Sequence, residues 1–250
     1  MLNFFKNNIK EESLTLPFTT DIHSHILPGV DDGSPDIKTS LSLIKGLHSL
    51  GIRKAIATPH IIGDLYRNSA STINNALATV KAAAKKEGIK MELRAAAEYM
   101  LDDYFIELLR SKTALLTLHK NIILTEISYS TAPDNLEQIL LEILAEGYQP
   151  ILAHPERYHY YHNNYKKYHQ LKELGFMLQV NILSLTGYYG KSVKKAAKYI
   201  LENGLANLAG TDLHHHNHLI ALTDDKNRKT INKYLGSKVY NDLDAILKSR

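Results

Sequence analysis

Short apolar segments alternate with longer amphipathic segments along most of the chain, and this alternation restricts the fold more than any other feature. The apolar segments predict strands at residues 18–23, 54–59, 91–97, 121–127, 149–153, 176–182 and 206–211. The amphipathic segments predict helices at residues 36–50, 70–87, 102–110, 134–146, 164–174, 191–203, 217–234 and 237–249. Because a helix follows each strand, we expect an α/β fold of parallel strands with outer helices, and a distorted TIM-like (β/α)7 barrel uses all seven strands.

The chain is expected to form one domain over residues 1–250, with an N-terminal arm at 1–17 and C-terminal helices at 217–250. Its 250 residues, of which 44% are hydrophobic, are enough for a full core. Glycines follow five of the predicted helices where each should end, and no proline- or serine-rich linker divides the pattern.

Composition excludes several classes of function. The absence of cysteine rules out disulfides, zinc-thiolate sites and any cysteine nucleophile. A formal net charge of +4, with lysines scattered along the helical segments, does not indicate a nucleic-acid partner. The sequence contains neither a signal peptide nor an apolar stretch that would insert into a membrane, so a cytoplasmic location is expected.

Residues 19–33 contain the densest group of potential metal ligands. Alternate side chains of a strand share a face, so His23 and His25 can point at the same ion. The glycines and proline that follow predict a turn, which can bring Asp31 or Asp32 back toward that ion.

Nearly every predicted strand ends in a histidine or a carboxylate. In an α/β barrel the carboxyl ends of the strands meet at one mouth, so these side chains should converge although they are far apart in sequence. The sixth strand differs, since it ends in the neutral residue Asn181. Beyond His23 and His25, the donors are His60, Glu98, Glu126, His154, Asp212 and His214.

So many donors exceed the needs of a single ion, and two or three ions per chain are expected. Imidazole and carboxylate ligands without thiolate suit manganese, iron or zinc. Such a site is suited to hydrolysis of phosphate esters, because an ion lowers the pKa of bound water from about 15.7 toward about 7 and so supplies hydroxide for in-line attack.

Three side chains are candidates for binding the substrate. Arg157 follows His154 closely and could hold a phosphate with two hydrogen bonds; its alternative is an ion pair with Glu156. Tyr66 and Arg67 follow the second strand and could also reach the mouth. The tyrosine-rich segment 157–168 suits either the rim of a pocket or a helix packed on the barrel.

With these motifs assembled, the chain resembles the polymerase-and-histidinol-phosphatase (PHP) superfamily, and more closely its bacterial protein-tyrosine phosphatases associated with capsular and exopolysaccharide synthesis. The resemblance extends from Asp21 to about His214. The motifs that carry it are Asp21-Ile-His-Ser-His-Ile-Leu-Pro-Gly-Val-Asp-Asp-Gly33, Ala57-Thr-Pro-His60, Ala97-Glu98, Leu124-Thr-Glu126, Ala153-His-Pro-Glu-Arg157 and Asp212-Leu-His214.

The resemblance implies a PHP-type barrel with a trinuclear, usually manganese-dependent centre that hydrolyses phosphotyrosine on a tyrosine kinase controlling polysaccharide export. An oligomer is possible. Arg157, His60 and Asp212 would be the catalytic residues. The implied metal ligands are His23, His25, Asp32, His60, Glu98, Glu126, His154, Asp212 and His214.

The final motif departs from the family pattern, which usually continues with an asparagine and then an arginine. Here histidines follow Asp212, and no arginine occurs before Arg228. His215, His216 or His218 could replace the missing group, or the histidine run could be inert.

Three other functions remain to be weighed against a protein phosphatase. A small-metabolite phosphatase of the histidinol-phosphate kind would use the same site with a narrower pocket. An amidohydrolase shares the barrel but usually recruits a lysine where this chain has Glu126. A non-catalytic metal-binding scaffold would keep the ligands without turnover.

Overall fold

The computed structural model describes residues 15–248, and its named strands all pair in parallel. One sheet has the order β1-β2-β4 and the other the order β3-β5-β6-β7-β8-β9, so neighbours in space follow the order of the chain. The strands are β1 (Thr20–Asp21), β2 (Lys54–Ala57), β3 (His60–Ile61), β4 (Glu92–Ala95), β5 (Glu98–Met100), β6 (Ile122–Glu126), β7 (Gln149–Ala153), β8 (Met177–Asn181) and β9 (Ala206–Gly210).

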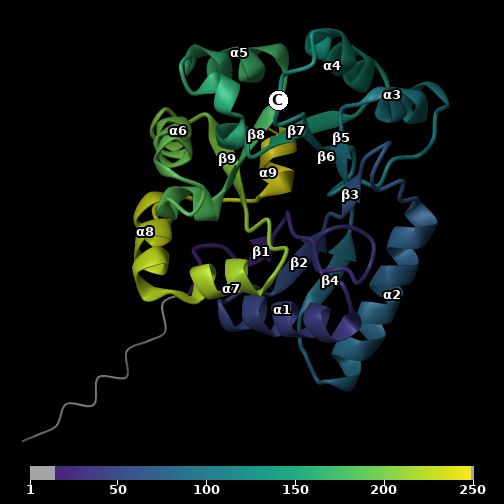
Figure 1. Ribbon diagram of the computed structural model, residues 1–250, viewed down its shortest axis with the longest axis vertical. Coiled ribbons are helices and arrows are strands. Elements are labelled where there is room, and N and C mark those ends of the chain that lie inside the picture. The colour runs from purple at the N-terminus through teal and green to yellow at the C-terminus, as the bar shows by residue number, and fades with distance from the viewer. Residues whose placement is uncertain (1–14, 249–250) are drawn as a thin grey trace, which may run out of the picture.

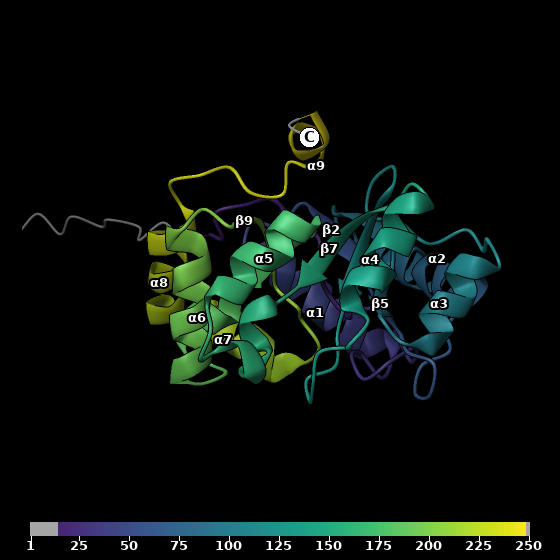
Figure 2. The same ribbon diagram turned by 90° about the horizontal axis from the view of Figure 1, so that it is seen from above.

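The α-helices lie outside the strands (Figures 1 and 2). Short 3-10 helices also follow β7 and β8. The α-helices are α1 (Ile37–Ser49), α2 (Ala70–Lys86), α3 (Asp103–Arg110), α4 (Leu136–Ala145), α5 (Lys166–Leu174), α6 (Lys191–Glu202), α7 (His216–Thr223), α8 (Asp225–Leu235) and α9 (Leu243–Lys248); the 3-10 helices are η1 (Pro155–Arg157), η2 (His159–Tyr161) and η3 (Ile182–Thr186). No helix in the described part is long and apolar enough to cross a membrane.

The predicted strands 54–59 and 91–97 end early, as β2 and β4, and a second short strand, β3 or β5, begins just beyond each predicted range and joins the other sheet. Between β2 and β3 stands Pro59, which has no N–H to donate to a neighbouring strand. Pairing resumes beyond it, because the Pro59 carbonyl accepts from the Glu98 N–H at 3.1 Å. The interruption shifts the chain from one sheet to the other while His60 and Glu98 stay side by side in register.

The residues just beyond β1 and β9 are joined to each other. The Asp212 N–H donates to the His23 carbonyl at 2.8 Å, and the His25 N–H donates to the Leu213 carbonyl at 2.9 Å. Ser24 and Leu213 form a parallel bridge there. These bonds bring the first and last strands of the chain together at the end where the predicted site lies.

The sequence predicts two long helices in the C-terminal region, and the structure differs from this prediction. Helix 217–234 is broken at Asp224, which is extended and whose carboxylate caps α8 by accepting from the Asn227 N–H at 2.9 Å. Helix 237–249 shortens to α9, because Asn241 adopts a left-handed backbone with φ of 63°. Propensity alone cannot predict these breaks, since the capping and hydrogen-bonding partners are tertiary.

The expected arm at residues 1–17 falls largely outside the described residues. Its last part is not a loose polar segment, because Leu16 is buried and its N–H donates to the Leu50 carbonyl at 2.8 Å. Burial of this leucine against α1 overrides the polar composition around it.

Helix α9 covers the end of the strands away from the predicted site. Leu243, Ile246 and Leu247 pack against a buried cluster that includes Ile56, Leu124 and other strand residues. Figure 2 shows α9 on the side of the sheets opposite α7. The core therefore extends to one end of the barrel and leaves the other end for polar side chains.

Asn241 fixes this covering segment to the strands. Its side-chain NH2 donates to the carbonyls of Thr20 and Ala209, both at 2.8 Å, and its Oδ1 accepts from the Ala209 N–H at 2.9 Å. Replacing Asn241 with alanine leaves buried backbone groups unpaired, and we expect a loss of about 2 kcal/mol or more in the free energy of unfolding in urea. Asn203→Ala, which removes an exposed bond to the Tyr199 carbonyl, is the control and should cost less than about 1 kcal/mol; equal losses would contradict this role.

Candidate metal centre

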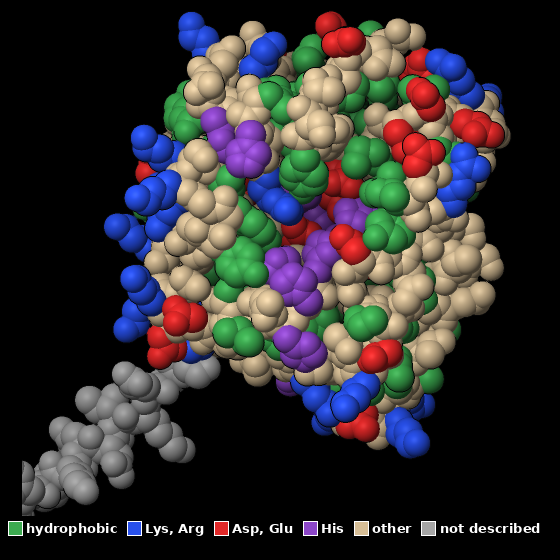
Figure 3. Space-filling view, viewed as in Figure 1, with side chains coloured by type: hydrophobic (Ala, Val, Ile, Leu, Met, Phe, Trp, Pro, Cys, Tyr) green, Lys and Arg blue, Asp and Glu red, His purple; other side chains and the backbone are tan. Residues whose placement is uncertain are grey.

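A cavity of about 280 Å³ opens at the carboxyl ends of the strands. In Figure 3 it is the hollow in which histidine, carboxylate and arginine side chains gather. Its lining comes from segments that are far apart in sequence, as the barrel prediction requires. The lining residues are Asp32, His60, Tyr129, His154, Arg157, Asp212, His214, His215 and His218.

His23 and His25 are held by hydrogen bonds on one ring nitrogen, which leaves the other for an ion. The Nδ1 of His23 lies 2.7 Å from Gln179 Oε1, and the Nδ1 of His25 lies 2.7 Å from Asp31 Oδ2. Their Nε2 atoms both face Glu98 Oε2, at 3.2 and 3.3 Å. Such partners fix the tautomer and the orientation of a metal-binding imidazole.

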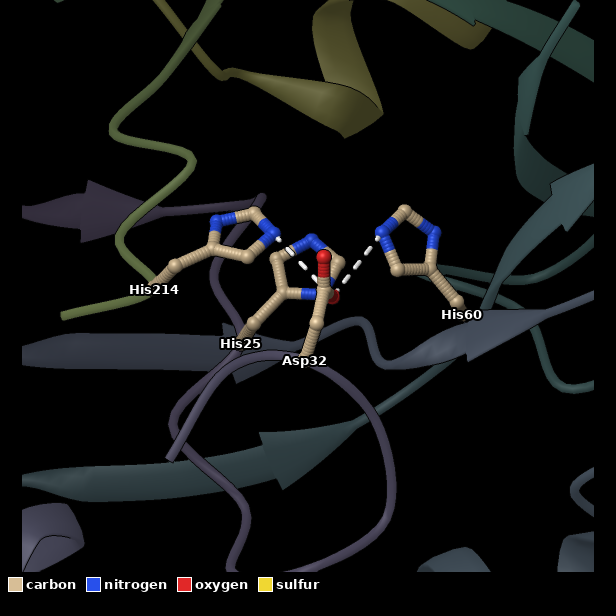
Figure 4. Close-up of side chains that lie close together, drawn as sticks. All are labelled: His25, Asp32, His60 and His214. Atoms are coloured by element: carbon tan, nitrogen blue, oxygen red, sulfur yellow. Dashed lines mark ion pairs between the residues drawn. The ribbon is translucent and has the colours of Figure 1, made fainter. Parts of the chain in front are cut away.

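Asp31 and Asp32 therefore have different environments. Asp31 is bonded to His25 and also accepts from the backbone N–H groups of Gly33 and His60. Asp32 instead has a side chain 54% exposed, with Oδ1 3.5 Å from His60 Nε2 and 3.7 Å from His214 Nε2. Figure 4 shows the Asp32 carboxylate between these two rings, in front of His25.

Several buried polar atoms at the centre lack hydrogen-bond partners among the described residues. They are His60 Nδ1, Glu98 Oε2 and Glu126 Oε1. His60 Nδ1 nevertheless lies 2.9 Å from Glu126 Oε1 and 3.3 Å from Glu98 Oε2. Crowded acceptors without donors between them are suited to a cation, so the residues present fit a metal ion.

The donor atoms form four overlapping groups, in each of which all of the atoms lie within 4.8 Å of one another. Because His23, His25, His60 and Glu98 each belong to two groups, the groups are contiguous and could hold more than one ion. The groups are His25-Asp32-His60-His214, His23-His154-Asp212, His23-His25-Glu98 and His60-Glu98-Glu126.

Asp212 divides its two carboxylate oxygens between different partners. Oδ2 accepts from Arg157 Nη1 at 2.6 Å and from Asn181 Nδ2 at 2.9 Å. Oδ1 remains within 3.3 Å of His23 Nε2 and 3.4 Å of His214 Nδ1. The neutral end of the sixth strand therefore orients a carboxylate instead of supplying one.

Asp212 and His154 also share an unusual backbone. Both are non-glycine residues with positive φ, at 50° and 35°. Such conformations cost of the order of 1–3 kcal/mol each and persist where surrounding contacts impose them. The backbone here is bent so that these two side chains point into the cavity.

Burial and neighbouring charges shift the pKa values of the centre in opposite directions. Burial lowers the pKa of His23, but Glu98 and Asp212 outweigh it and raise the pKa to about 9. Burial raises the pKa of Asp212, but His23, His214 and Arg157 hold it well below its usual range. The Asp212 carboxylate is thus ionised and available to a cation.

The substrate-binding candidates are placed differently from one another. Arg157 lines the cavity, paired with Asp212 rather than with Glu156, and its guanidinium lies 5.0 Å from the Tyr129 ring and 4.4 Å from the Tyr189 ring. The Tyr66 ring stacks on His60 with centroids 6.0 Å apart. Arg67 instead donates to the Gly63 carbonyl and covers the Tyr104 ring, away from the cavity lining.

The tyrosine-rich segment 157–168 mostly packs on the barrel. Tyr158, Tyr161 and Tyr168 are buried, and the Tyr158 hydroxyl donates to the Ala153 carbonyl at 3.2 Å. Of this segment only Arg157 lines the cavity.

Sequence reasoning missed several residues of the centre. Gln179 and Tyr189 gave no signal, because each acts on a partner distant in sequence. Tyr129, which stacks on His154 with centroids 5.7 Å apart, lies in the loop after β6 and could have been found from the mouth-side position of that loop. His215 and His218 line the cavity, whereas His216 is turned away toward Ser42.

The fold and the centre together define a class: an α/β protein with a multinuclear histidine-carboxylate site at the carboxyl ends of parallel strands. A family model described as capsular polysaccharide synthesis, CpsB/CapC, matches residues 19–245. The chain belongs to this family.

Named relatives agree with this assignment. The chain is 31% identical over 195 residues to tyrosine-protein phosphatase YwqE of Bacillus subtilis, covering 78% of this chain and 76% of that protein. It is 30% identical over 201 residues to tyrosine-protein phosphatase CpsB of Streptococcus pneumoniae, covering 78% and 82%.

Solved structures support the fold. One comes from a description of YwqE of Bacillus subtilis and CpsB of Streptococcus pneumoniae as unique metal-dependent tyrosine phosphatases. It superposes with a TM-score of 0.78 at 28% identity, over 92% of this chain and 91% of that chain. A lactonase from Listeria monocytogenes, at 11% identity and a TM-score of 0.55 over 90% and 93% of the two chains, shares the fold alone. The predicted PHP-type α/β fold is confirmed.

Asn181 offers a test of how the centre is built. Asn181→Ala removes one of the two donors to Asp212 Oδ2, and we expect metal affinity measured by titration calorimetry to fall by about 10- to 100-fold. Ser184→Ala is the control, because Ser184 bonds Glu156 in the same buried region without touching Asp212. If both variants bound metal as the unaltered protein does, Asn181 would not be positioning Asp212.

Proposed function

We propose that this protein is a metal-dependent protein-tyrosine phosphatase that acts on a tyrosine kinase controlling capsular or exopolysaccharide synthesis. The observation that carries the proposal is the set of nine donors brought together in four overlapping groups, with buried acceptors that have no hydrogen-bond partner among the described residues. Membership of the CpsB/CapC family, whose named relatives are tyrosine-protein phosphatases, supports it.

The residues that would hold the ions are the nine predicted ligands, with two or three ions of Mn²⁺ as the preferred occupants and iron or zinc as substitutes. Bound ions would supply a nucleophile from water at neutral pH and neutralise the phosphoryl oxygens. The four overlapping donor groups offer enough ligands for this number of ions.

Arg157 would bind the phosphoryl group beside the ions. One of its nitrogens is engaged by Asp212, and its guanidinium also contacts the rings of Tyr129 and Tyr189. No other hydrogen bond from this guanidinium to a described residue is found, so its remaining N–H groups could form charge-assisted bonds as negative charge develops on the transferred group. His60 and Asp212 would contribute as ligands closest to the reacting phosphate.

An aromatic ester suits the cavity because flat rings line it or contact its lining residues. Tyr129 lines the cavity, Tyr189 contacts Arg157, and Tyr188 lies against His218 with centroids 5.3 Å apart. Aromatic pairs contribute about 0.5–1.5 kcal/mol beyond the area that they bury, so this wall favours a phenyl phosphate.

The direct test is turnover of a phosphotyrosine peptide by protein loaded with Mn²⁺. We expect activity to be lost on chelation, to return when Mn²⁺ is restored, and to fall at least about 100-fold in His154→Ala. Metal content measured by mass spectrometry should fall in the same variant. Activity that persisted after both changes would rule out the proposed chemistry.

Comparing substrates separates this function from that of a small-metabolite phosphatase. The phosphotyrosine peptide should be hydrolysed with a higher kcat/KM than histidinol phosphate under the same metal loading. The reverse order would assign the cavity to a small metabolite.

Arg157→Lys tests the role of the guanidinium. Lysine keeps the charge but cannot form two parallel hydrogen bonds or stack flat between two rings. We expect kcat/KM for the phosphotyrosine peptide to fall by about 10- to 1,000-fold, as when one preorganised donor is removed from an anion-binding site. The metal content should stay near that of the unaltered protein; an unchanged kcat/KM would exclude Arg157 from phosphate binding.

A further inference from the structure

One side of the molecule beside the cavity is covered by lysines. Helices α5 and α6 together carry seven lysines and two acidic residues, Glu173 and Glu202, in a chain whose total formal charge is only +4. The lysines are scattered in sequence but come from two adjacent helices, α5 and α6. They are Lys166, Lys167, Lys172, Lys191, Lys194, Lys195 and Lys198.

Ring contacts join these helices, and α8 beyond them, into one face. Tyr199 of α6 packs on Tyr165, the N-cap residue of α5, with centroids 4.7 Å apart. Lys198 of α6 lies 5.0 Å from the ring of Tyr234 in α8. In Figure 3 Lys and Arg side chains line the left edge, beside these helices and in the same view that looks into the cavity.

These lysines are not paired with described carboxylates, in contrast to three lysines elsewhere in the protein. Within residues 15–248, Lys45, Lys54 and Lys120 each pair with a carboxylate at 2.7–3.2 Å. None of the seven lysines on α5 and α6 forms an ion pair with a described carboxylate, although Lys172 and Lys194 donate to backbone carbonyls. The surface thus carries positive charge that the fold leaves uncompensated.

The same surface is continuous with the wall of the cavity. Tyr189, which stacks on Arg157, stands two residues before Lys191, the first residue of α6. Tyr188 is 43% exposed and contacts His218, which lines the cavity. A peptide whose side chain enters the cavity past these tyrosines would pass its neighbouring residues over the N-terminal half of α6.

We propose that this α5–α6 face binds an Asp/Glu-rich segment flanking the phosphorylated tyrosine of the protein substrate, and so selects acidic target sequences. The inference rests on the proposed phosphatase function and adds the chemistry of the partner. A predominantly positive surface attracts acidic segments at long range and speeds their association, and it leaves neutral segments unaffected.

The test uses full-length protein loaded with Mn²⁺ and two phosphotyrosine peptides, one flanked by Asp and Glu and the other by Asn and Gln. Lys191 and Lys195 are exposed and one helical turn apart on α6, and the variant Lys191→Glu/Lys195→Glu reverses both charges. Lys81→Glu/Lys85→Glu is the matched control, since these exposed lysines have the same spacing on α2, across the molecule (Figure 1).

We expect the unaltered protein to prefer the acidic peptide by at least about fivefold in kcat/KM at low salt, and this preference to shrink toward one at about 0.5 M salt. The α6 variant should lose the preference and the α2 variant should keep it. The rate of p-nitrophenyl phosphate hydrolysis is used to normalise the activity of each preparation. Equal rates on the two peptides, or equal effects of the two variants, would overturn the proposal.

The fluorescence anisotropy of fluorescein-labelled peptides, measured in EDTA, compares the binding of the two peptides without turnover. If no phosphotyrosine substrate were hydrolysed, the proposed function would fail, while the binding comparison would still decide this inference. If the α6 variant instead lost binding to vesicles containing phosphatidylglycerol while its peptide preference was unchanged, the surface would belong to a membrane and the proposal would be wrong.

Discussion

The structure depends on a concentration of acceptors that it does not itself neutralise. Glu98, Glu126 and Asp212 are almost completely buried around a group of imidazoles, and Glu98 Oε2 and Glu126 Oε1 have no hydrogen-bond partner among the described residues. Burial of unpaired charge costs several kcal/mol, so such a centre is stable only where cations or protons are bound. Packing in the rest of the fold holds these groups in place when no cation is bound.

Much of the fold and most of the centre could be predicted because they depend on local patterns. Strand periodicity gave the order of the elements, and the convergence of His60, Glu98 and His154 followed from parallel topology alone. The interruption at Pro59 and the break at Asp224 were missed because each depends on tertiary pairing or a cap. The parts played by Gln179 and Asn181 were missed for the same reason, since their partners lie 156 and 31 residues away in sequence.

Asn181 and Asp31 illustrate how a polar residue can be essential to a centre without being a ligand. Each donates to or accepts from a residue that faces the ions, and each is fixed in turn by backbone groups: Leu183 N–H for Asn181 and Gly33 N–H for Asp31. Sequence alone presents Asp31 as a candidate of the same kind as Asp32, and it presents Asn181 as the neutral exception among the strand ends. Only the hydrogen bonds in the structure distinguish a residue that can bind an ion from one that orients an ion-binding side chain.

The charges of the cavity also impose an order on binding. Asp32, Glu98, Glu126 and Asp212 place four carboxylates near one guanidinium, so a phosphate dianion approaching the metal-free cavity meets repulsion. The raised pKa of His23 shows that the metal-free centre recruits protons to offset this charge. A cation held by these carboxylates would offset their charge, with Arg157 as a further positive group in the cavity lining. We therefore expect metal to bind before phosphate, and the guanidinium, bonded to Asp212 and in contact with two tyrosine rings, is preorganised for the phosphate.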